Sequence, residues 1–396
     1  MEKIKKWIII IFLLVIYIYI NYFTLLPNSI ILIEGEKIDF KNIFGVERIE
    51  STNTFNDGYN TNNIEFKLLG FHVKNVNVTT IENAEVVPIG KIIGLKLYTD
   101  GVLVVGFSEI EDINKNITKP YEKTDIKEGD TILKINGEKV EDIEALKNII
   151  KKSNGEKLNF TILRDNSILS SSIIPTKTNK NEYKIGIWVK DAATGVGTLT
   201  FYEPISKKFA ALGHGITDND TESLINIESG ELVTSRVINV QKGEEESPGE
   251  IRGTILNQQT IGSVKNNSSF GIYGILNNLT SLNIDTSKKY KVALRNEIEL
   301  GEAYILCSID NSNVPKEYKI DIEKIYFDND FNNKSMLIRV TDKKLIEKTG
   351  GIIRGLSGAP IIQNNKFVGA VTNVLVSNPE IGYAIFGDLM VKEMQK

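Results

Sequence analysis

The sequence is poor in the two residue types that most often bind metals and carry redox chemistry. Its 396 residues include one cysteine and two histidines. A single cysteine excludes a disulfide within the chain, and a zinc or iron–sulfur site could be assembled only with carboxylates. Cys307 lies in an apolar run and is expected to be a buried hydrophobe. We therefore expect no metal and no cofactor.

A calcium loop is also not expected. The run Asp328–Asn332 resembles the start of one, but no glycine follows at the sixth place, and Arg339 stands where the closing glutamate belongs. This run is predicted to be a polar turn.

Strong charge of one sign is missing as well. The net charge is -4, the isoelectric point is about 5.6, and no basic run occurs outside the first six residues. Binding of nucleic acid depends on clustered positive charge. Nucleic acid is therefore not an expected partner.

One long apolar segment runs from Trp7 to Leu26, and as a helix it would rise about 30 Å, the thickness of the hydrocarbon layer. Lysines precede it, and none follows before Lys37, so the N-terminus is expected in the cytoplasm and the chain after Pro27 outside it. A cleaved signal peptide is the alternative. Because residues 21–28 contain no small-x-small cleavage site, we favour an uncleaved signal anchor over residues 1–27.

The next two regions differ in how regular their sequence patterns of apolar, polar and turn residues are. Residues 28–85 are predicted to be a small β-rich region, where His72 is expected to be a half-buried strand residue without a catalytic role. From residue 86 the pattern becomes regular. Asn136-Gly137 is typical of a two-residue hairpin turn, and Asp142 is expected to cap a helix that ends at Ser153. Four apolar residues share one face of that helix: Ile143, Leu146, Ile149 and Ile150.

This series resembles a PDZ domain, and we place that domain at residues 86–178. The match rests on Gly129-Asp130-x-Ile132-x-x-Ile135-Asn136-Gly137. In that family a loop here formed by Ile93, Gly94 and Leu95 would bind a peptide carboxylate, and the peptide would add as a strand to an open sheet edge. A structural β domain without a ligand is the alternative, because the polar insertion from Ser108 to Thr124 could cover the groove.

Residues 184–396 follow a polar linker at Thr176–Tyr183 and are predicted to form a β-barrel or sandwich from many short β-rich runs. The segment Gly355–Pro360 (Gly-Leu-Ser-Gly-Ala-Pro) places Ser357 between glycines. A serine nucleophile needs a base, and His214 is the only histidine of this region. The amides of Gly355 and Ser357 could form an oxyanion hole. We therefore predict a hydrolase.

An acidic residue should orient the imidazole. Asp342 ends an apolar strand fifteen residues before the serine, and the bare sequence favours it only slightly over the other aspartates. The competitors are Asp218 and Asp220, which we expect to be solvated or capping residues, and Asp310.

A resemblance extends over nearly the whole chain. Its elements are the N-terminal anchor, the PDZ domain, Gly195–Tyr202, Ala211–His214, Thr349–Ile352 and Ser357–Gln363. Together they resemble the stage IV sporulation protein B peptidase family of endospore-forming Firmicutes, which are serine peptidases with a chymotrypsin-like double β-barrel. The resemblance implies His214, Asp342 and Ser357 as a catalytic triad.

The family further implies self-cleavage and cutting of a membrane-associated regulator that frees an intramembrane protease, in the space between the forespore and mother-cell membranes. Leu356 replaces the aspartate that pairs with a new N-terminus in digestive enzymes, so activation by that ion pair is excluded. The expected function is a membrane-tethered serine endopeptidase of mainly β fold. A catalytically silent PDZ scaffold and an envelope quality-control protease are the alternatives.

Overall fold

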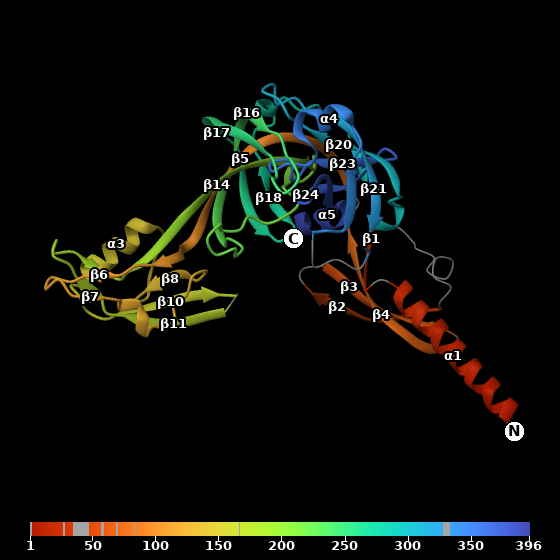
Figure 1. The fold of residues 1–396 in the computed structure, drawn as a ribbon, viewed down its shortest axis with the longest axis horizontal. Coiled ribbons are helices and arrows are strands. Elements are labelled where there is room, and N and C mark those ends of the chain that lie inside the picture. Colours follow the sequence, from red (N-terminus) through yellow and green to blue (C-terminus); the bar gives the residue numbers. More distant parts are fainter. Residues whose placement is uncertain are drawn as a thin grey trace.

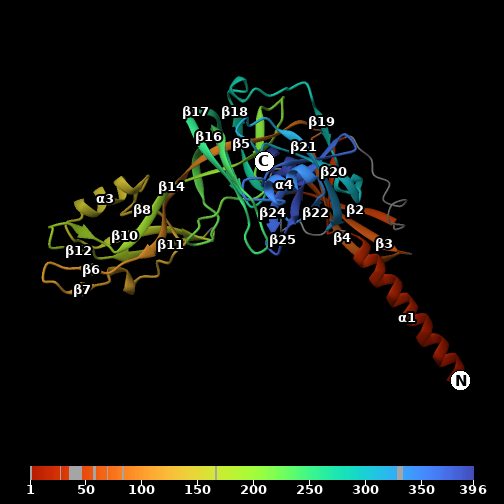
Figure 2. The same cartoon turned by 45° about the horizontal axis from the view of Figure 1, so that its top comes forward.

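Strands dominate the computed structural model, which describes residues 2–26, 28–34, 47–56, 59–68, 70–82, 84–165, 167–327 and 333–396. Figures 1 and 2 show a central β-rich body with the PDZ part on one side, and a small sheet and a projecting helix on the other. The predicted polar turn at Asp328–Asn332 lies outside the described residues.

The projecting helix is α1, Glu2–Leu25, whose side chains are mostly exposed. Its apolar window Ile4–Asn21 is long enough to cross a membrane. The predicted N-terminal apolar helix is thus present. Near its C-terminal end the helix contacts β4, where the Tyr19 hydroxyl donates to the carbonyl of Val73.

The small β-rich region forms a sheet of four strands in the order β1-β4-β3-β2, with β1 parallel to β4 and the other neighbours antiparallel. His72 lies on β4, as a strand residue, but it is exposed where we expected it to be half-buried. The strands are β1 Ser29–Ile33, β2 Glu47–Asn56, β3 Tyr59–Leu68 and β4 Phe71–Ile81.

The PDZ part packs one helix on a small sheet. Its elements are the end of β5 (Glu85–Phe107), β6 Ile110–Glu111, β7 Ile117–Thr118, η1 Pro120–Lys123, β8 Thr131–Ile135, β9 Glu138–Lys139, α3 Ile143–Lys152, β10 Leu158–Arg164 and β11 Ser167–Ile173. The Asp142 side chain accepts from the amide of Ala145 and caps α3. Asn136 and Gly137 have φ of 51° and 84° and join β8 to β9. Both local predictions are confirmed.

Strand β5 runs from the central body into the PDZ part (Figure 1). Its first half pairs with β14 (Ile187–Tyr202) on one edge and with β16 (Ile227–Gln241) on the other. Ile93, Gly94 and Leu95 lie within that half, so the predicted carboxylate-binding loop is a doubly paired strand without a free edge. A Cβ on Gly94 would lie 2.8 Å from Val233 Cγ2. The glycine therefore serves close packing between strands.

Strand β14 also bridges the two parts. Its residues Ile187–Lys190 pair with the end of β5 and contribute to the PDZ core, while Val196–Tyr202 belongs to the central body. The predicted linker at Thr176–Tyr183 forms a short hairpin of β12 (Thr176–Lys177) and β13 (Tyr183–Lys184).

The central body contains two hydrophobic clusters. The first gathers β5 and β14–β18 around Leu199, Phe209 and Leu232, and the second gathers β19–β25 with α4 and α5 around Ile305, Ile361 and Phe367. A closed double barrel remains a prediction. The remaining elements are β15 Lys208–Ala211, β17 Glu250–Ser268, β18 Gly271–Leu276, η2 Thr280–Leu282, β19 Tyr290–Val292, η3 Arg295–Glu297, β20 Gly301–Cys307, β21 Lys316–Ile325, β22 Met336–Val340, α4 Lys343–Thr349, β23 Pro360–Gln363, β24 Lys366–Leu375, β25 Asn378–Phe386 and α5 Gly387–Gln395.

Cys307 ends β20 inside the second cluster and is fully buried. Burial raises the pKa of its thiol, so the reactive thiolate is disfavoured. The prediction that this cysteine is a small core residue is confirmed.

Candidate active site

The segment that carries His214 leaves the first cluster through a strained turn. After β15 the amide of Gly213 donates to the carbonyl of Ala211 at 2.9 Å, which closes a γ-turn around Leu212. Leu212 has φ of 70°, a conformation that costs energy for a side chain other than glycine. Burial of the Leu212 side chain in the first cluster holds this turn. The turn brings His214 out of the sheet.

The imidazole of His214 is half-buried, and one nitrogen has a fixed partner. Nδ1 lies 2.8 Å from the carbonyl oxygen of Gly215. Because a carbonyl only accepts, Nδ1 must carry the proton, and in the neutral ring Nε2 keeps its lone pair. Burial lowers the pKa of His214 from its ordinary value of 6.5. The neutral ring with a basic Nε2, the form that a general base requires, is therefore favoured.

The segment that carries Ser357 begins in a tight turn. The amide of Leu356 donates to the carbonyl of Ile353 at 3.1 Å, and Gly355 between them has φ of 99°. Such a φ at the third turn position is a glycine requirement. Leu356 itself is fully buried in the second cluster.

Two amides of this turn are free to bind a ligand. The carbonyls of Arg354 and Leu356 accept from the amides of Ile251 and Ala359. Among the described residues, the amides of Gly355 and Ser357 donate to no protein group. Free N–H groups beside a serine hydroxyl are what an oxyanion hole requires.

The two segments pack directly against each other at the junction of the clusters. A Cβ on Gly358 would lie 2.6 Å from the amide nitrogen of Leu212. The Ser357 hydroxyl donates to the carbonyl of Thr372 at 2.6 Å, and a Cβ on Gly213 would lie 3.1 Å from Thr372 Cγ2. Thr372 therefore touches both segments. No hydrogen bond among the described residues joins His214 to Ser357 in this state.

The side chain of Asp342 binds backbone amides of helix α4. Its carboxylate caps α4 by accepting from the amides of Lys344 and Leu345, at 2.9 and 3.1 Å. It lines a surface hollow of about 620 Å³ with Lys343, Lys344 and Lys348 among others. No hydrogen bond among the described residues connects it to His214.

The position of Asp342 follows from the course of β22. Met336, where β22 begins, pairs with Ala384, and Ile385 contacts Gly213 next to His214. The strand then runs about 13 Å to Val340, at about 3.3 Å per residue. Asp342 therefore follows the end of β22 that is remote from Gly213, and the structure does not bring it to the imidazole.

The competing aspartates are engaged locally. Asp218 accepts from the amides of Asp220 and Thr221 and pairs with Lys190 at 2.9 Å. It holds its own turn as predicted, but it is buried rather than solvated. Asp310 accepts from Ser312 and pairs with Lys316 at 3.1 Å.

Sequence reasoning missed some of the residues that support the site. The Thr372 hydroxyl donates to the carbonyl of Asn333, whose side-chain amide donates to the carbonyl of Gly213. Nothing in the local sequence marks Thr372 or Asn333. The Thr198 hydroxyl donates to the carbonyl of Gly355 in the nucleophile segment, and the run Gly195–Tyr202 that contains Thr198 was the available signal.

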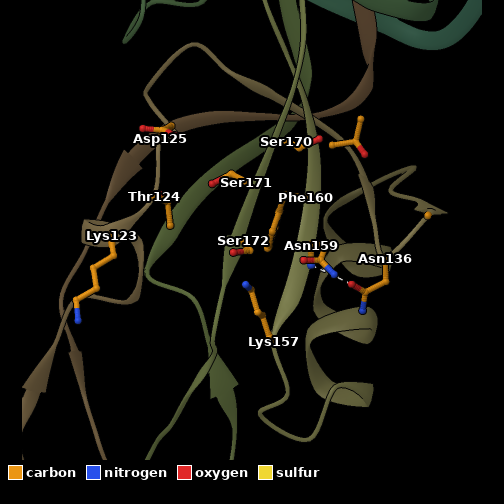
Figure 3. A pocket seen from close by; sticks show the side chains of 12 residues that line it. Lys123, Thr124, Asp125, Asn136, Lys157, Asn159, Phe160, Ser170, Ser171 and Ser172 are labelled. Carbon is orange, nitrogen blue, oxygen red and sulfur yellow. Dashed lines mark hydrogen bonds between the residues drawn. The ribbon is translucent and has the colours of Figure 1, made fainter.

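A large hollow of about 820 Å³ lies elsewhere, on the PDZ sheet (Figure 3). Ser170, Ser171 and Ser172 of β11 line it, and the amide of Asn159 donates to the Asn136 side chain at its edge. The hollow is polar and is lined by neither His214 nor Ser357. Size alone does not identify the reactive centre here.

The comparison of the sequence with known protein families agrees with a serine peptidase site. The sequence matches the family model described as SpoIVB peptidase S55 over residues 181–391, more than half of the chain. The chain belongs to the SpoIVB peptidase S55 family. This S55 peptidase also matches the PDZ domain model over residues 92–174, so it is a serine peptidase that contains a PDZ domain.

Two solved structures share limited similarity with this S55 peptidase. The PDZ domain of the SdrC-like protein from Listeria monocytogenes is 21% identical over 23% of this chain and 87% of that chain, with a TM-score of 0.19. The HtrA-type protease AlgW with decapeptide is 11% identical over 52% of this chain and 53% of that chain, with a TM-score of 0.28. None of the curated proteins compared with the chain matches it.

Proposed function

We propose that this S55 peptidase is a membrane-tethered serine endopeptidase in which Ser357 is the nucleophile and His214 the general base. The packing of Gly358 against Leu212 carries the proposal, because it joins the two segments that hold these side chains. The free amides of Gly355 and Ser357 would bind the oxyanion.

The reaction follows from these roles. Ser357 Oγ leaves the Thr372 carbonyl by rotation of its side chain and attacks the carbonyl carbon of the scissile peptide, while its proton moves to His214 Nε2. The carbonyl electron pair moves to the oxygen, where the two amides stabilise the negative charge. Collapse expels the amine, which takes the proton from His214, and water then hydrolyses the acyl ester by the same steps.

The biological role is proposed from family membership and from α1. We infer that α1 anchors the chain with its N-terminus in the cytoplasm and the rest outside it, because lysines precede the apolar segment. The family resemblance supports sporulation signalling between forespore and mother-cell membranes, through self-cleavage and cleavage of a membrane-associated regulator. The PDZ part would bind a peptide segment of the chain itself or of a partner.

Labelling with a serine-reactive phosphonate tests the proposed chemistry. The full-length chain in detergent is expected to be labelled at Ser357, as located by mass spectrometry. Because only the neutral imidazole accepts the proton and burial lowers the pKa of His214, the fall of the labelling rate in acid should have its midpoint below pH 6.5. An acid midpoint above 6.5 would contradict the assigned environment of His214.

The matched variant is His214→Gln, with substitution of the exposed His72 on β4, His72→Gln, as the control. The His214→Gln protein should lose labelling, and the His72→Gln protein should be labelled at the wild-type rate at every pH. Equal labelling of all three proteins would remove His214 from the mechanism. No labelling of the folded wild-type chain would favour a silent scaffold.

Asp342 is expected to stabilise α4 without acting on the imidazole. Asp342→Ala should lower the unfolding free energy by about 1 kcal/mol, because an N-cap is lost, while Asp342→Ser keeps a capping oxygen. Both variants should retain labelling of Ser357 within about twofold, whereas loss of a triad aspartate costs about 10⁴-fold. An inactive but stable Asp342→Ser protein would restore Asp342 to the triad.

A further inference from the structure

Thr198 lies in the C-terminal half of β14 and is fully buried. Its hydroxyl donates to the carbonyl of Gly355 at 2.7 Å, and its amide donates to the carbonyl of Ser357 at 3.2 Å. One residue thus holds two carbonyls of the segment that carries the nucleophile.

The same residue also holds the histidine segment. The carbonyl of Thr198 accepts from the amide of Leu212 at 3.2 Å, at the centre of the strained turn before His214. Thr198 therefore contacts both reactive segments through its backbone, and the nucleophile segment through its side chain as well.

We propose that Thr198 is a positioning residue that fixes the oxyanion hole and the nucleophile, which rests on the function proposed above. Gly355 has no side chain to restrict its rotation, and its carbonyl belongs to the peptide plane that lies between the two planes carrying the amides of Gly355 and Ser357. The Thr198 hydroxyl holds the carbonyl between Gly355 and Leu356, so it limits rotation of the turn. Without that bond, we expect the neighbouring peptide planes, which carry the amides of Gly355 and Ser357, to be held less firmly in the orientation that binds a substrate oxygen.

Thr200 provides a matched comparison on the same strand. Thr200 is also fully buried, and it lies where the pairing of β14 with β5 and β15 shifts register between Leu199 and Phe201. Its hydroxyl has no hydrogen-bond partner among the described residues. Removal of the Thr198 hydroxyl therefore breaks a hydrogen bond to the nucleophile segment, whereas removal of the Thr200 hydroxyl breaks none among the described residues.

The experiment compares phosphonate inactivation of the full-length chain as wild type, Thr198→Val, Thr198→Ser and Thr200→Val. Thr198→Val should lower the limiting inactivation rate at least about tenfold, because a misaligned donor loses part of the hundredfold or greater effect of an oxyanion donor. The phosphonate concentration at half-maximal rate should stay unchanged. Thr198→Ser and Thr200→Val should react within about twofold of wild type.

Other results of this experiment would overturn the role of the Thr198 hydroxyl or the proposed function. Wild-type rates in folded Thr198→Val, or a common loss in Thr198→Val and Thr198→Ser, would overturn the role of the hydroxyl. If Thr198→Val does not fold, as judged by thermal unfolding, Thr198→Ala must show the same selective loss of limiting rate. If the wild-type chain itself is not labelled, the proposed function is rejected, and the role of Thr198 is rejected with it.

Discussion

The Ser357→Ala chain is expected to show no self-cleavage. The alanine removes the oxygen that attacks the peptide and leaves the backbone of the turn unchanged. Because nucleophile and base act as a unit, the rate should fall by at least about 10⁴-fold. Incubation of the purified full-length chain, followed by mass spectrometry of the fragments, measures the effect and maps the cut sites.

Ser335→Ala is the matched control for this loss. Ser335 is buried, and its hydroxyl has no hydrogen-bond partner among the described residues. This variant should yield the wild-type fragments at the wild-type rate. Fragments that persist at that rate in the Ser357→Ala protein would remove Ser357 from the reaction.

Gly358→Ala is expected to disable the enzyme through its backbone. A Cβ at this position would lie 2.3 Å from the carbonyl oxygen of Thr198 and 2.6 Å from the amide of Leu212, and the residue has φ of 94°. Both contacts are to backbone, so relief requires the two reactive segments to separate. Overpacking and positive φ should each cost about 1–3 kcal/mol of unfolding free energy, and Ser357 labelling should be lost.

Gly301→Ala isolates the contribution of the backbone conformation. Gly301 has φ of 110°, and a Cβ there would meet no atom within 4 Å. This variant should lose about 1 kcal/mol of unfolding free energy and keep its labelling. If Gly358→Ala behaved like Gly301→Ala in denaturant unfolding and in labelling, the close packing of the two segments would be refuted.

The local parts of the fold were predictable because their signals are short in sequence. Asp142 caps α3, and Asn136-Gly137 turns a hairpin, since each depends on residues within one turn. Cys307 was placed in the core by its apolar neighbours. These features needed no knowledge of the partners across the sheet.

The features that the sequence alone could not settle depend on long-range partners. Gly94 suggested a loop, but its partner Val233 on β16 lies far away in the sequence and requires the glycine for packing. Asp342 precedes a helix as well as the serine, so the sequence could not separate a cap from a triad member.

The candidate site shows the same division. His214 and Ser357 could be predicted as candidates because histidine is scarce and the serine lies between glycines. Thr372 and Asn333 reach the site from strands and turns distant in sequence, and neither has a local motif. The supporting contacts therefore became visible only in three dimensions.

A crystal structure of the full-length chain after phosphonate labelling tests the central claim most directly. The account predicts a phosphorus bond to Ser357 Oγ, a phosphonyl oxygen about 2.7–3.1 Å from the amides of Gly355 and Ser357, and His214 Nε2 within hydrogen-bonding reach of Oγ. A phosphonyl oxygen turned away from both amides, with the imidazole out of reach of the serine oxygen, would contradict it.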